Sequence, residues 1–299
     1  MRRNNEGGGT SGQPPGHLYV YCLEGVVSPE VEPGLGETFL GNWVEGASSF
    51  LFFSEPAEDR VLRVVEDHSE LQYVEDHRFT YEEWLGDRFE RFFAGDFEIC
   101  PAWEVPGPPR KAALRMLLDP GVVFGSGLHP TTRECLEALS WLWRNDPPET
   151  VLDLGTGTGV LAVAAGLLGA GRVVAVDLNP LCVHTAARNV KLNGLDSRVE
   201  TVLGPAEGVL DRSGELVLAN IHYEVILDLL RNEGLWKRRW IVFSGLMRTQ
   251  ARALKDRLRG MGMEIAREWD QDMVWHTLAV RGTTNTAVRR CRKERAFCR

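Results

Sequence analysis

The sequence predicts an α/β protein built on a mostly parallel β-sheet, with a small α+β module in front of it. Three observations support this prediction. From residue 112 onward, short apolar segments suited to strands alternate with helical segments, as in parallel α/β folds. A Gly-rich turn joins one such strand to a helix, the place where these folds bind ligands. The chain of 299 residues is long enough for one large domain and a smaller one.

The composition excludes several classes of protein. Hydrophobic residues make up 43% of the chain and charged residues 25%, which is ordinary for a globular protein. No apolar run reaches the roughly 18 residues of a membrane span. Residues 7–16 are rich in Gly where a signal peptide needs an apolar core, so we expect a cytoplasmic protein. The six cysteines form no CxxC pair, and we therefore expect neither a disulfide framework nor a metal site.

The first part of the chain divides into an N-terminus and a small module. Residues 1–16 are rich in Gly, Pro, Asn and Ser and are expected to be disordered. Residues 17–76 form the module. Within it, residues 17–23 and 49–53 are suited to strands, and residues 58–67 have helical spacing.

The charge of this region is unusual. Residues 17–100 contain 19 Asp and Glu against five Arg and no Lys, within a chain of net charge −8. An acidic surface attracts basic partners over long range and repels nucleic-acid backbones. We therefore expect the module to recognise a basic protein substrate. The alternative is an acidic surface kept for solubility.

A helix and linker, residues 77–111, lead to the main domain, residues 112–282. Residues 80–93 carry one apolar stripe at helical spacing, and residues 105–111 (VPGPPRK) form a rigid connector. The main domain is expected to contain strands at 150–154, 172–176, 199–203, 215–219, 240–244, 264–268 and 274–281, and helices at 160–168, 180–192 and 248–261. Residues 283–299 hold six Arg or Lys against Glu294 and are expected to be a basic, disordered tail. Contact of this tail with RNA is the alternative, and direct nucleic-acid binding is not expected elsewhere.

The Gly-rich turn is the strongest chemical signal. Asp153 closes a strand that leads into Gly155, Gly157 and Gly159, and a helix follows. Glycines allow a tight turn and the close approach of a ligand, and the free N–H groups of a helix start suit polar ligand groups. A dinucleotide fingerprint, GxGxxG, would need its third glycine where Val160 stands.

Asp177 ends the next strand, about twenty residues beyond the glycines, where an acid can accept hydrogen bonds from both ribose hydroxyls. The alternative is that Asp177 caps the helix that begins at Pro180.

The pattern of an acid, Asp153, before GxGxG resembles the first motif of the class I methyltransferases. The resemblance implies a Rossmann-like sheet of seven mostly parallel strands and S-adenosyl-L-methionine as the cofactor.

A longer stretch resembles one bacterial family. The segments ICPAW at 99–103 and DPGVVFGSGLHPTT at 119–132, together with Asn220-Ile221 and Ser244-Gly245, resemble the methyltransferases of ribosomal protein eleven of the large subunit. The resemblance covers residues 80–282. It implies a protein methyltransferase that modifies lysine or N-terminal amines, with a large-subunit ribosomal protein as its substrate.

The resemblance assigns cofactor contacts to Thr132, Gly155, Asp177 and Asn220. Thr132 offers a hydroxyl in a Gly-rich loop suited to a closing lid, or else serves as an ordinary helix N-cap. Asn220, at the carboxyl end of a strand, either orients the amine or holds the methionine carboxylate, with a turn-forming Asn as the alternative. Catalytic roles are thus expected for Asn220 and, as a proton acceptor, His222; cofactor-binding roles are expected for Thr132, Asp153, Gly155, Gly157, Gly159, Asp177 and Asn220.

Three departures from the family pattern bear on the substrate. Leu128 replaces a Thr before His-Pro, His222 replaces a leucine-like residue, and residues 17–76 do not visibly match. Two alternatives therefore stay open: an enzyme of the same fold that acts on another protein or a small molecule, and a cofactor-binding interaction protein without catalysis. Nucleobase methylation is disfavoured because an Asn-Pro-Pro-aromatic motif is absent from the sequence.

Overall fold

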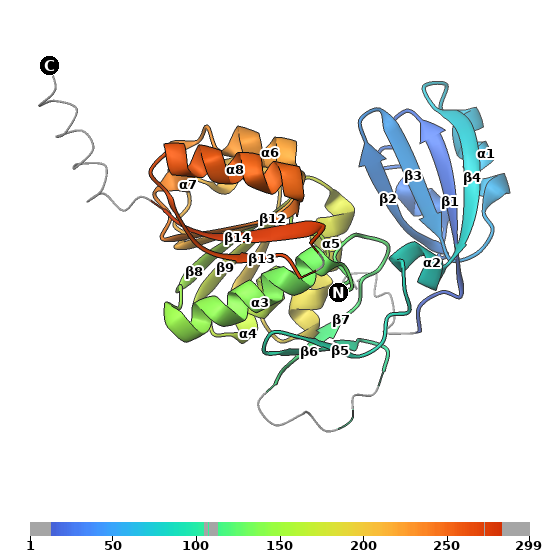
Figure 1. Ribbon diagram of the computed structural model, residues 1–299. Helices are drawn as coiled ribbons and strands as arrows, with labels where there is room; N and C mark the ends of the chain where they lie inside the picture. Colours follow the sequence, from blue (N-terminus) through green and yellow to red (C-terminus); the bar gives the residue numbers. More distant parts are fainter. Residues whose placement is uncertain (1–12, 105–106, 108–112, 272, 283–299) are drawn as a thin grey trace, which may run out of the picture. The chain divides into compact units, whose positions relative to one another are not determined.

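The computed structural model describes residues 13–104, 107, 113–271 and 273–282 (Figure 1). The expected N-terminal disorder up to residue 12, most of the connector at 105–111 and the basic tail at 283–299 lie outside these residues. The described chain divides into two compact units. The N-terminal unit holds residues 13–90, 101–104 and 107, and the second unit holds residues 91–100, 113–271 and 273–282. None of the described helices combines the length and apolar character needed to cross a membrane.

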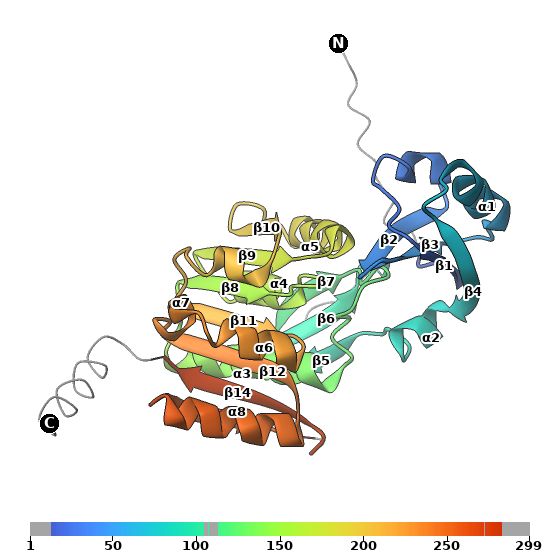
Figure 2. The same cartoon turned by 90° about the horizontal axis from the view of Figure 1, so that it is seen from above.

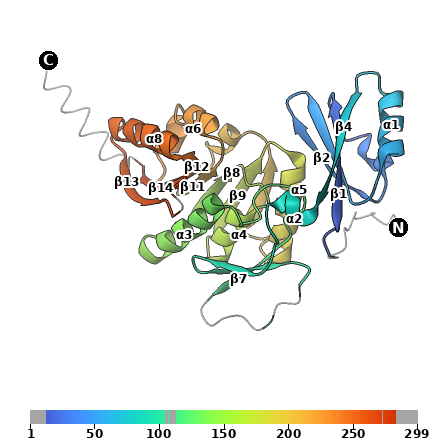
Figure 3. The same ribbon diagram turned by 45° about the vertical axis from the view of Figure 1, so that its right-hand side comes forward.

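The N-terminal unit contains a four-stranded antiparallel sheet of order β2-β3-β1-β4. Its elements are β1 (His17–Glu24), η1 (Glu32–Leu35), β2 (Phe39–Glu45), β3 (Ser48–Phe53), α1 (Glu58–Asp67), β4 (Gln72–Thr80) and α2 (Tyr81–Leu85). Helix α1 packs against one face of this sheet (Figure 3). Its Val61 belongs to a buried hydrophobic cluster that includes Tyr21, Leu23 and Phe53. The predicted module ends at residue 76, whereas β4 of its sheet continues to Thr80.

The single helix expected over residues 80–93 is wrong. Helix α2 begins with a capping box at Thr80 and ends at Leu85, because Gly86 adopts a left-handed conformation with φ of 81°. Residues Phe92–Ala94 form β5, which pairs with β6 (Phe97–Pro101) in a three-stranded sheet of order β5-β6-β7. The third strand is β7 (Leu114–Leu118).

The second unit is built on a seven-stranded sheet of order β10-β9-β8-β11-β12-β14-β13 (Figure 2). Its strands are β8 (Thr150–Leu154), β9 (Arg172–Asp177), β10 (Val199–Leu203), β11 (Leu216–Asn220), β12 (Trp240–Met247), β13 (Glu264–Trp269) and β14 (Trp275–Arg281). The first five are parallel to one another, and β14 runs antiparallel to both β12 and β13. The predicted α/β fold with a mostly parallel sheet is confirmed.

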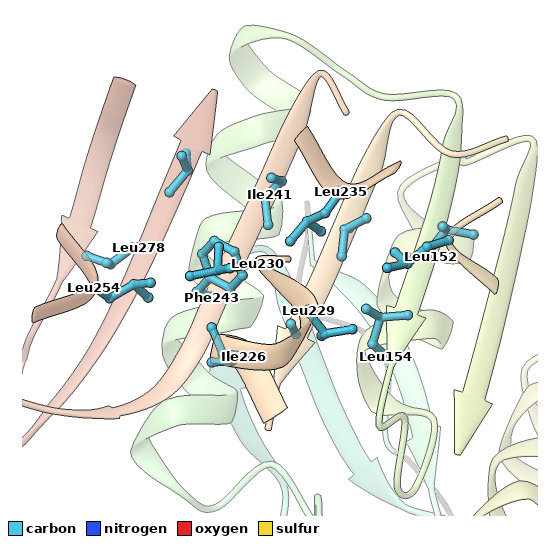
Figure 4. Packing of buried hydrophobic residues seen from close by; sticks show 14 of the residues in the cluster. Leu152, Leu154, Ile226, Leu229, Leu230, Leu235, Ile241, Phe243, Leu254 and Leu278 are labelled. Carbon is cyan, nitrogen blue, oxygen red and sulfur yellow. The ribbon is translucent and has the colours of Figure 1, made fainter. Parts of the chain in front are cut away.

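Helices cover both faces of this sheet (Figure 1). They are α3 (Pro130–Asn145), α4 (Val160–Leu167), α5 (Pro180–Leu192), η2 (Ala206–Val209), α6 (Tyr223–Leu229), α7 (Glu233–Trp236) and α8 (Arg248–Gly260). On one face, Leu152, Phe243 and Leu278 of the strands pack against Ile226 of α6 and Leu254 of α8 (Figure 4). Burial on both faces explains why these strands are almost continuously apolar.

The strand order fixes where a ligand can bind. From β8 the chain first adds β9 and β10 on one side of the sheet and then β11 and β12 on the other. The crevice beyond the carboxyl ends of strands at such a reversal is the usual ligand site of open α/β sheets. Residues 155–159, Asp177 and Asn220 all lie at these ends.

Candidate functional site

The Gly-rich turn after β8 needs its glycines for two reasons. Gly155, Gly157 and Gly159 have φ angles of 68°, 56° and 81°, which side chains rarely adopt. A Cβ on Gly155 would lie 2.4 Å from Ile221 Cγ2, and one on Gly157 would lie 2.5 Å from the carbonyl oxygen of Phe124. The turn is therefore packed closely against two other segments of the site.

Asp153 supports the turn from inside the protein. Its side chain is 1% exposed, and its Oδ2 accepts a hydrogen bond of 2.6 Å from Thr156 Oγ1. Burial raises the pKa of the Asp153 carboxyl to about 7, against the smaller opposing effect of the Thr156 hydrogen bond. A direct contact between Asp153 and a cofactor stays a prediction.

Asp177 at the end of β9 is bonded directly to the turn. Its Oδ2 accepts a hydrogen bond of 2.9 Å from the Gly157 N–H, and its Oδ1 accepts one of 3.0 Å from the Asn179 N–H. Helix α5 is capped by Asn179, whose Oδ1 accepts from the Leu181 N–H at 2.9 Å. The alternative that Asp177 caps this helix is therefore wrong. Its carboxylate is partly exposed at the carboxyl end of the sheet.

The segment before α3 lies against the same turn. The Thr158 N–H donates to the Phe124 carbonyl at 3.2 Å, and Thr158 Oγ1 donates to the Gly125 carbonyl at 2.7 Å. Gly125 has a φ of 108°, and a Cβ there would lie 2.9 Å from Thr158 Oγ1. The segment that resembles the family's DPGxAFGTGTHPTT thus contacts the turn through its backbone.

Two asparagines, one in α5 and one at its C-cap, were missed by the sequence analysis. Buried Asn189 donates through Nδ2 to the carbonyls of Asp119 at 3.0 Å and Thr158 at 2.8 Å, and its Oδ1 accepts from the Asp119 N–H at 2.9 Å. One helical turn later, Asn193 accepts from the Leu117 N–H at 2.9 Å and donates to the Leu117 carbonyl at 2.7 Å. The signal was a pair of asparagines four residues apart at the end of a helix, since Asn is disfavoured inside helices.

Thr132 lies in the first turn of α3. The helix is capped by His129, whose ring accepts from the Thr131 N–H, so the alternative that Thr132 is the N-cap is wrong. Thr132 is 1% exposed, and its Oγ1 has no hydrogen-bond partner in the part of the chain that the structure describes. Because a buried hydroxyl without a partner is costly, this atom fits a polar group of a bound ligand.

The start of α3 is held to the carboxyl end of β12 by a buried polar network. Ser244 Oγ donates to the Thr131 carbonyl at 3.3 Å and lies 2.6 Å from Thr277 Oγ1. Thr277 Oγ1 in turn donates to Glu134 Oε2 at 2.8 Å. All of these side chains are buried, so the network fixes the helix that carries Thr132 against the sheet.

Asn220 and His222 follow one another at the end of β11 but differ in setting. Asn220 is partly exposed and pairs with Ser244 of β12 across the sheet. Its neighbour Ile221 packs against Gly155 of the turn. His222 is exposed and occupies the N-cap position of α6 without a side-chain capping hydrogen bond. The structure thus connects Asp177 to the turn by a hydrogen bond and Asn220 to it through Ile221.

Comparisons with known proteins point to one family. The family model described as ribosomal protein L11 methyltransferase (PrmA) matches residues 55–283. The chain is 33% identical over 243 residues to the ribosomal protein L11 methyltransferase of Edwardsiella ictaluri, covering 78% of this chain and 80% of that one. It is 35% identical over 246 residues to that of Shewanella halifaxensis, covering 79% and 81%. A solved ribosomal protein L11 methylase from Lactobacillus delbrueckii subsp. bulgaricus matches with a TM-score of 0.53 and 30% identity over 63% of this chain and 96% of that one.

Proposed function

Because the chain belongs to the ribosomal protein L11 methyltransferase family, we propose that its acceptor is ribosomal protein L11, modified on lysine or N-terminal amines. It is an S-adenosyl-L-methionine-dependent protein methyltransferase. The observation on which the placement of the cofactor rests is the Asp177 carboxylate, bonded to the Gly157 N–H at the reversal of strand order. A cytoplasmic location belongs to the same proposal.

The residues at the carboxyl ends of the central strands fit this cofactor. The Asp177 carboxylate accepts from the ribose hydroxyls, and the glycine turn lets the cofactor approach the backbone. Asp153 holds the turn through Thr156, and the Thr132 hydroxyl, which has no hydrogen-bond partner among the described residues, would meet a polar group of the cofactor. Asn220, at the carboxyl end of β11, would contact either the methionine end of the cofactor or the acceptor amine.

When bound, the cofactor supplies an electrophilic methyl group. The acceptor amine must be neutral to attack it, whereas a lysine has a reference pKa of about 10.4. A cation next to the amine lowers that pKa, and alignment of the two reactants supplies much of the rate. Asn220 orients the amine through its side-chain oxygen, and His222 receives the amine proton from its exposed position after β11.

The acidic N-terminal unit recruits the basic substrate in this proposal. Its helix α1 carries Glu66 and Asp67 in the last turn, where the helix dipole disfavours negative charge, and that turn holds no basic residue. Both residues are exposed, and exposed Glu70 follows. Negative charge at the end of α1 lowers the stability of the helix, and a role in binding the substrate explains why it is present.

One alternative keeps a specific observation in its favour. The family match begins at residue 55, so strands β1, β2 and β3 lie outside it. An enzyme of the same fold that acts on another protein would likewise match the family in its catalytic domain and differ from it in the first strands. Family membership disfavours the second alternative, a cofactor-binding protein without catalysis.

Radiolabelled S-adenosyl-L-methionine tests the acceptor. The enzyme is incubated with ribosomes from a bacterial strain that lacks its own L11 methyltransferase, and the labelled proteins are separated by size. We expect label in L11 and in no other ribosomal protein. Label in a different protein would favour the alternative acceptor, and no label with any fraction would favour a non-catalytic protein.

A further inference from the structure

Cys22, Glu75 and His77 gather on one face of the sheet in the N-terminal unit. Each offers one ligand atom, and the three atoms all lie within 4.8 Å of one another. We propose that these three side chains bind a zinc ion. The proposal is independent of the proposed function, because it uses no residue of the cofactor site.

The register of two strands creates this cluster. Cys22 of β1 lies directly opposite Glu75 of β4, and Val20 lies opposite His77. Side chains two residues apart on a strand share a face, so Glu75 and His77 project on the same side as Cys22. The separation of more than fifty residues along the chain explains why no short metal motif marks the site in the sequence.

The cluster lies on the face of the sheet that helix α1 leaves uncovered. Tyr21 and Leu23, the neighbours of Cys22, point into the core beneath α1. Cys22 therefore projects to the opposite face, where its side chain is 9% exposed. The side chains of Glu75 and His77 are 60% and 44% exposed, which leaves room for water as a fourth ligand.

The spacing of the donor atoms suits tetrahedral zinc. His77 Nε2 lies 3.3 Å from Glu75 Oε1. Tetrahedral zinc bonds of about 2.0–2.2 Å to nitrogen and oxygen place those two atoms about 3.3–3.5 Å apart. The two exposed ligands thus already have the separation that the ion requires, and Cys22 Sγ completes a third corner after a small side-chain movement.

The chemistry of the donors selects the metal. A thiolate and an imidazole favour zinc over magnesium or calcium, which prefer oxygen ligands alone. On binding, the S–H bond of Cys22 is replaced by a sulfur–zinc bond, and the proton passes to water. No oxidation or reduction takes place. The bound ion would link β4, at the edge of the sheet, to β1.

The test uses the full-length chain after treatment with a chelator, with Cys291 and Cys298 replaced by Ser so that their thiols do not contribute. Zinc is titrated by calorimetry, and cobalt is added as a spectroscopic probe. We expect one zinc ion per chain and a thiolate-to-cobalt charge-transfer band. Because loss even of an outer contact lowers metal affinity about 10–100-fold, His77→Ala should weaken zinc binding by at least tenfold. Cys22→Ala should remove the band.

The control is His68→Ala, a histidine of the same unit outside the cluster, which should bind zinc as the parent protein does. Glu75→Gln and His77→Ala change exposed side chains, so they test the site even if Cys22→Ala fails to fold. Absence of zinc binding would overturn the proposal. Binding that these variants leave unchanged, or a cobalt complex without the thiolate band, would overturn it equally, and the Glu75–His77 contact would then be a surface ion pair.

Discussion

At Asp177, one carboxylate bonds two backbone N–H groups, those of Gly157 and Asn179, and still faces the carboxyl edge of the sheet. This arrangement leaves the lone pairs that are not used by the backbone available to ribose hydroxyls. The side chain therefore shapes the turn before a cofactor arrives, which lowers the cost of ordering the site on binding.

Replacing this carboxylate should weaken cofactor binding. Asp177→Ala removes the acceptor of the ribose hydroxyls and of the Gly157 N–H, and the expected loss is about 1–3 kcal/mol, or about ten- to a hundredfold in affinity. Calorimetry with S-adenosyl-L-methionine measures it, and Asp196→Ala, an exposed acid of the same unit, is the control. A correctly folded Asp177→Ala protein with the affinity of the wild type would show that the ribose lies elsewhere.

Asp153 should make stability depend on pH. Its pKa of about 7 in the folded protein lies above the unfolded value, so the folded state binds the proton more tightly. The stability from this proton is fully present below about pH 4 and is lost as the pH rises to about 7, with a total of up to about 4 kcal/mol. Asp153→Asn has no such proton, and the variant should gain stability relative to the wild type between pH 5 and pH 8.

Denaturant unfolding of both proteins across this pH range measures the difference. The Asn side chain still accepts from Thr156 Oγ1, so the hydrogen bond is a matched feature of the two proteins. Parallel stability curves for wild type and variant would show that the Asp153 carboxyl titrates near its ordinary pKa.

At the scale of elements, local sequence signals located the parallel strands well. The strands expected at 150–154 and 199–203 and the helices at 58–67 and 180–192 have those bounds in the structure. These segments are bounded by glycines and prolines or carry one uninterrupted pattern. The expected helix at 80–93 failed because Phe92 pairs with Ile99 in a strand ladder, which helical spacing alone does not reveal.

The residues of the site likewise divide into those with a local sequence pattern and those that act through distant contacts. The glycine turn and Asp177 carry local patterns, and Asn220 was singled out by the family resemblance. The structure places all of them at the carboxyl ends of strands, and their contacts with the cofactor stay predictions. Asn189, by contrast, acts through carbonyl and N–H groups about 30 and 70 residues away, and no local pattern announces such contacts. The buried network of Ser244 and Thr277 was missed for the same reason.

Asn189 of α5 and Asn193 at its C-cap allow a matched test of how the turn is positioned. Asn189→Ala leaves the Thr158 carbonyl and both Asp119 groups without their partner, whereas Asn193→Ala removes the bonds to Leu117 and to the Asn189 carbonyl. Each change should lower the free energy of unfolding by about 1–3 kcal/mol. Only Asn189→Ala should also weaken cofactor binding in calorimetry, because Asn189 alone contacts the turn. Equal cofactor affinity in the two variants would assign Asn189 a purely structural role.

At the scale of the whole molecule, charge separates the two parts of the chain. Acids dominate residues 17–100, while the remainder carries more basic than acidic residues. Attraction of a basic substrate by such a surface acts on the encounter and is screened over about 8–10 Å at physiological salt. Substrate capture and methyl transfer should therefore respond differently to salt.

Neutralising the acids at the end of α1 tests this separation. The variant Glu66→Gln, Asp67→Asn, Glu70→Gln should raise KM for the protein substrate up to about tenfold at low salt and reduce its salt dependence. Cofactor affinity should stay unchanged, and the unit should be no less stable, since the helix dipole disfavours these charges. Steady-state kinetics at several salt concentrations measure the effect, with Glu207→Gln of the other unit as control. An unchanged, equally salt-dependent KM would leave the acidity as a device for solubility.

The most direct test combines purified L11, S-adenosyl-L-methionine and the enzyme, followed by mass spectrometry of the intact acceptor and its peptides. We expect mass increases in whole methyl increments, located on lysine side chains or the N-terminal amine. The Asn220→Ala enzyme should lose more in kcat than in cofactor affinity, because its main expected role is to orient the amine; an equal loss in both would assign Asn220 to the methionine end of the cofactor. The account would be contradicted if wild-type enzyme that binds its cofactor left L11 unmodified and labelled a different acceptor.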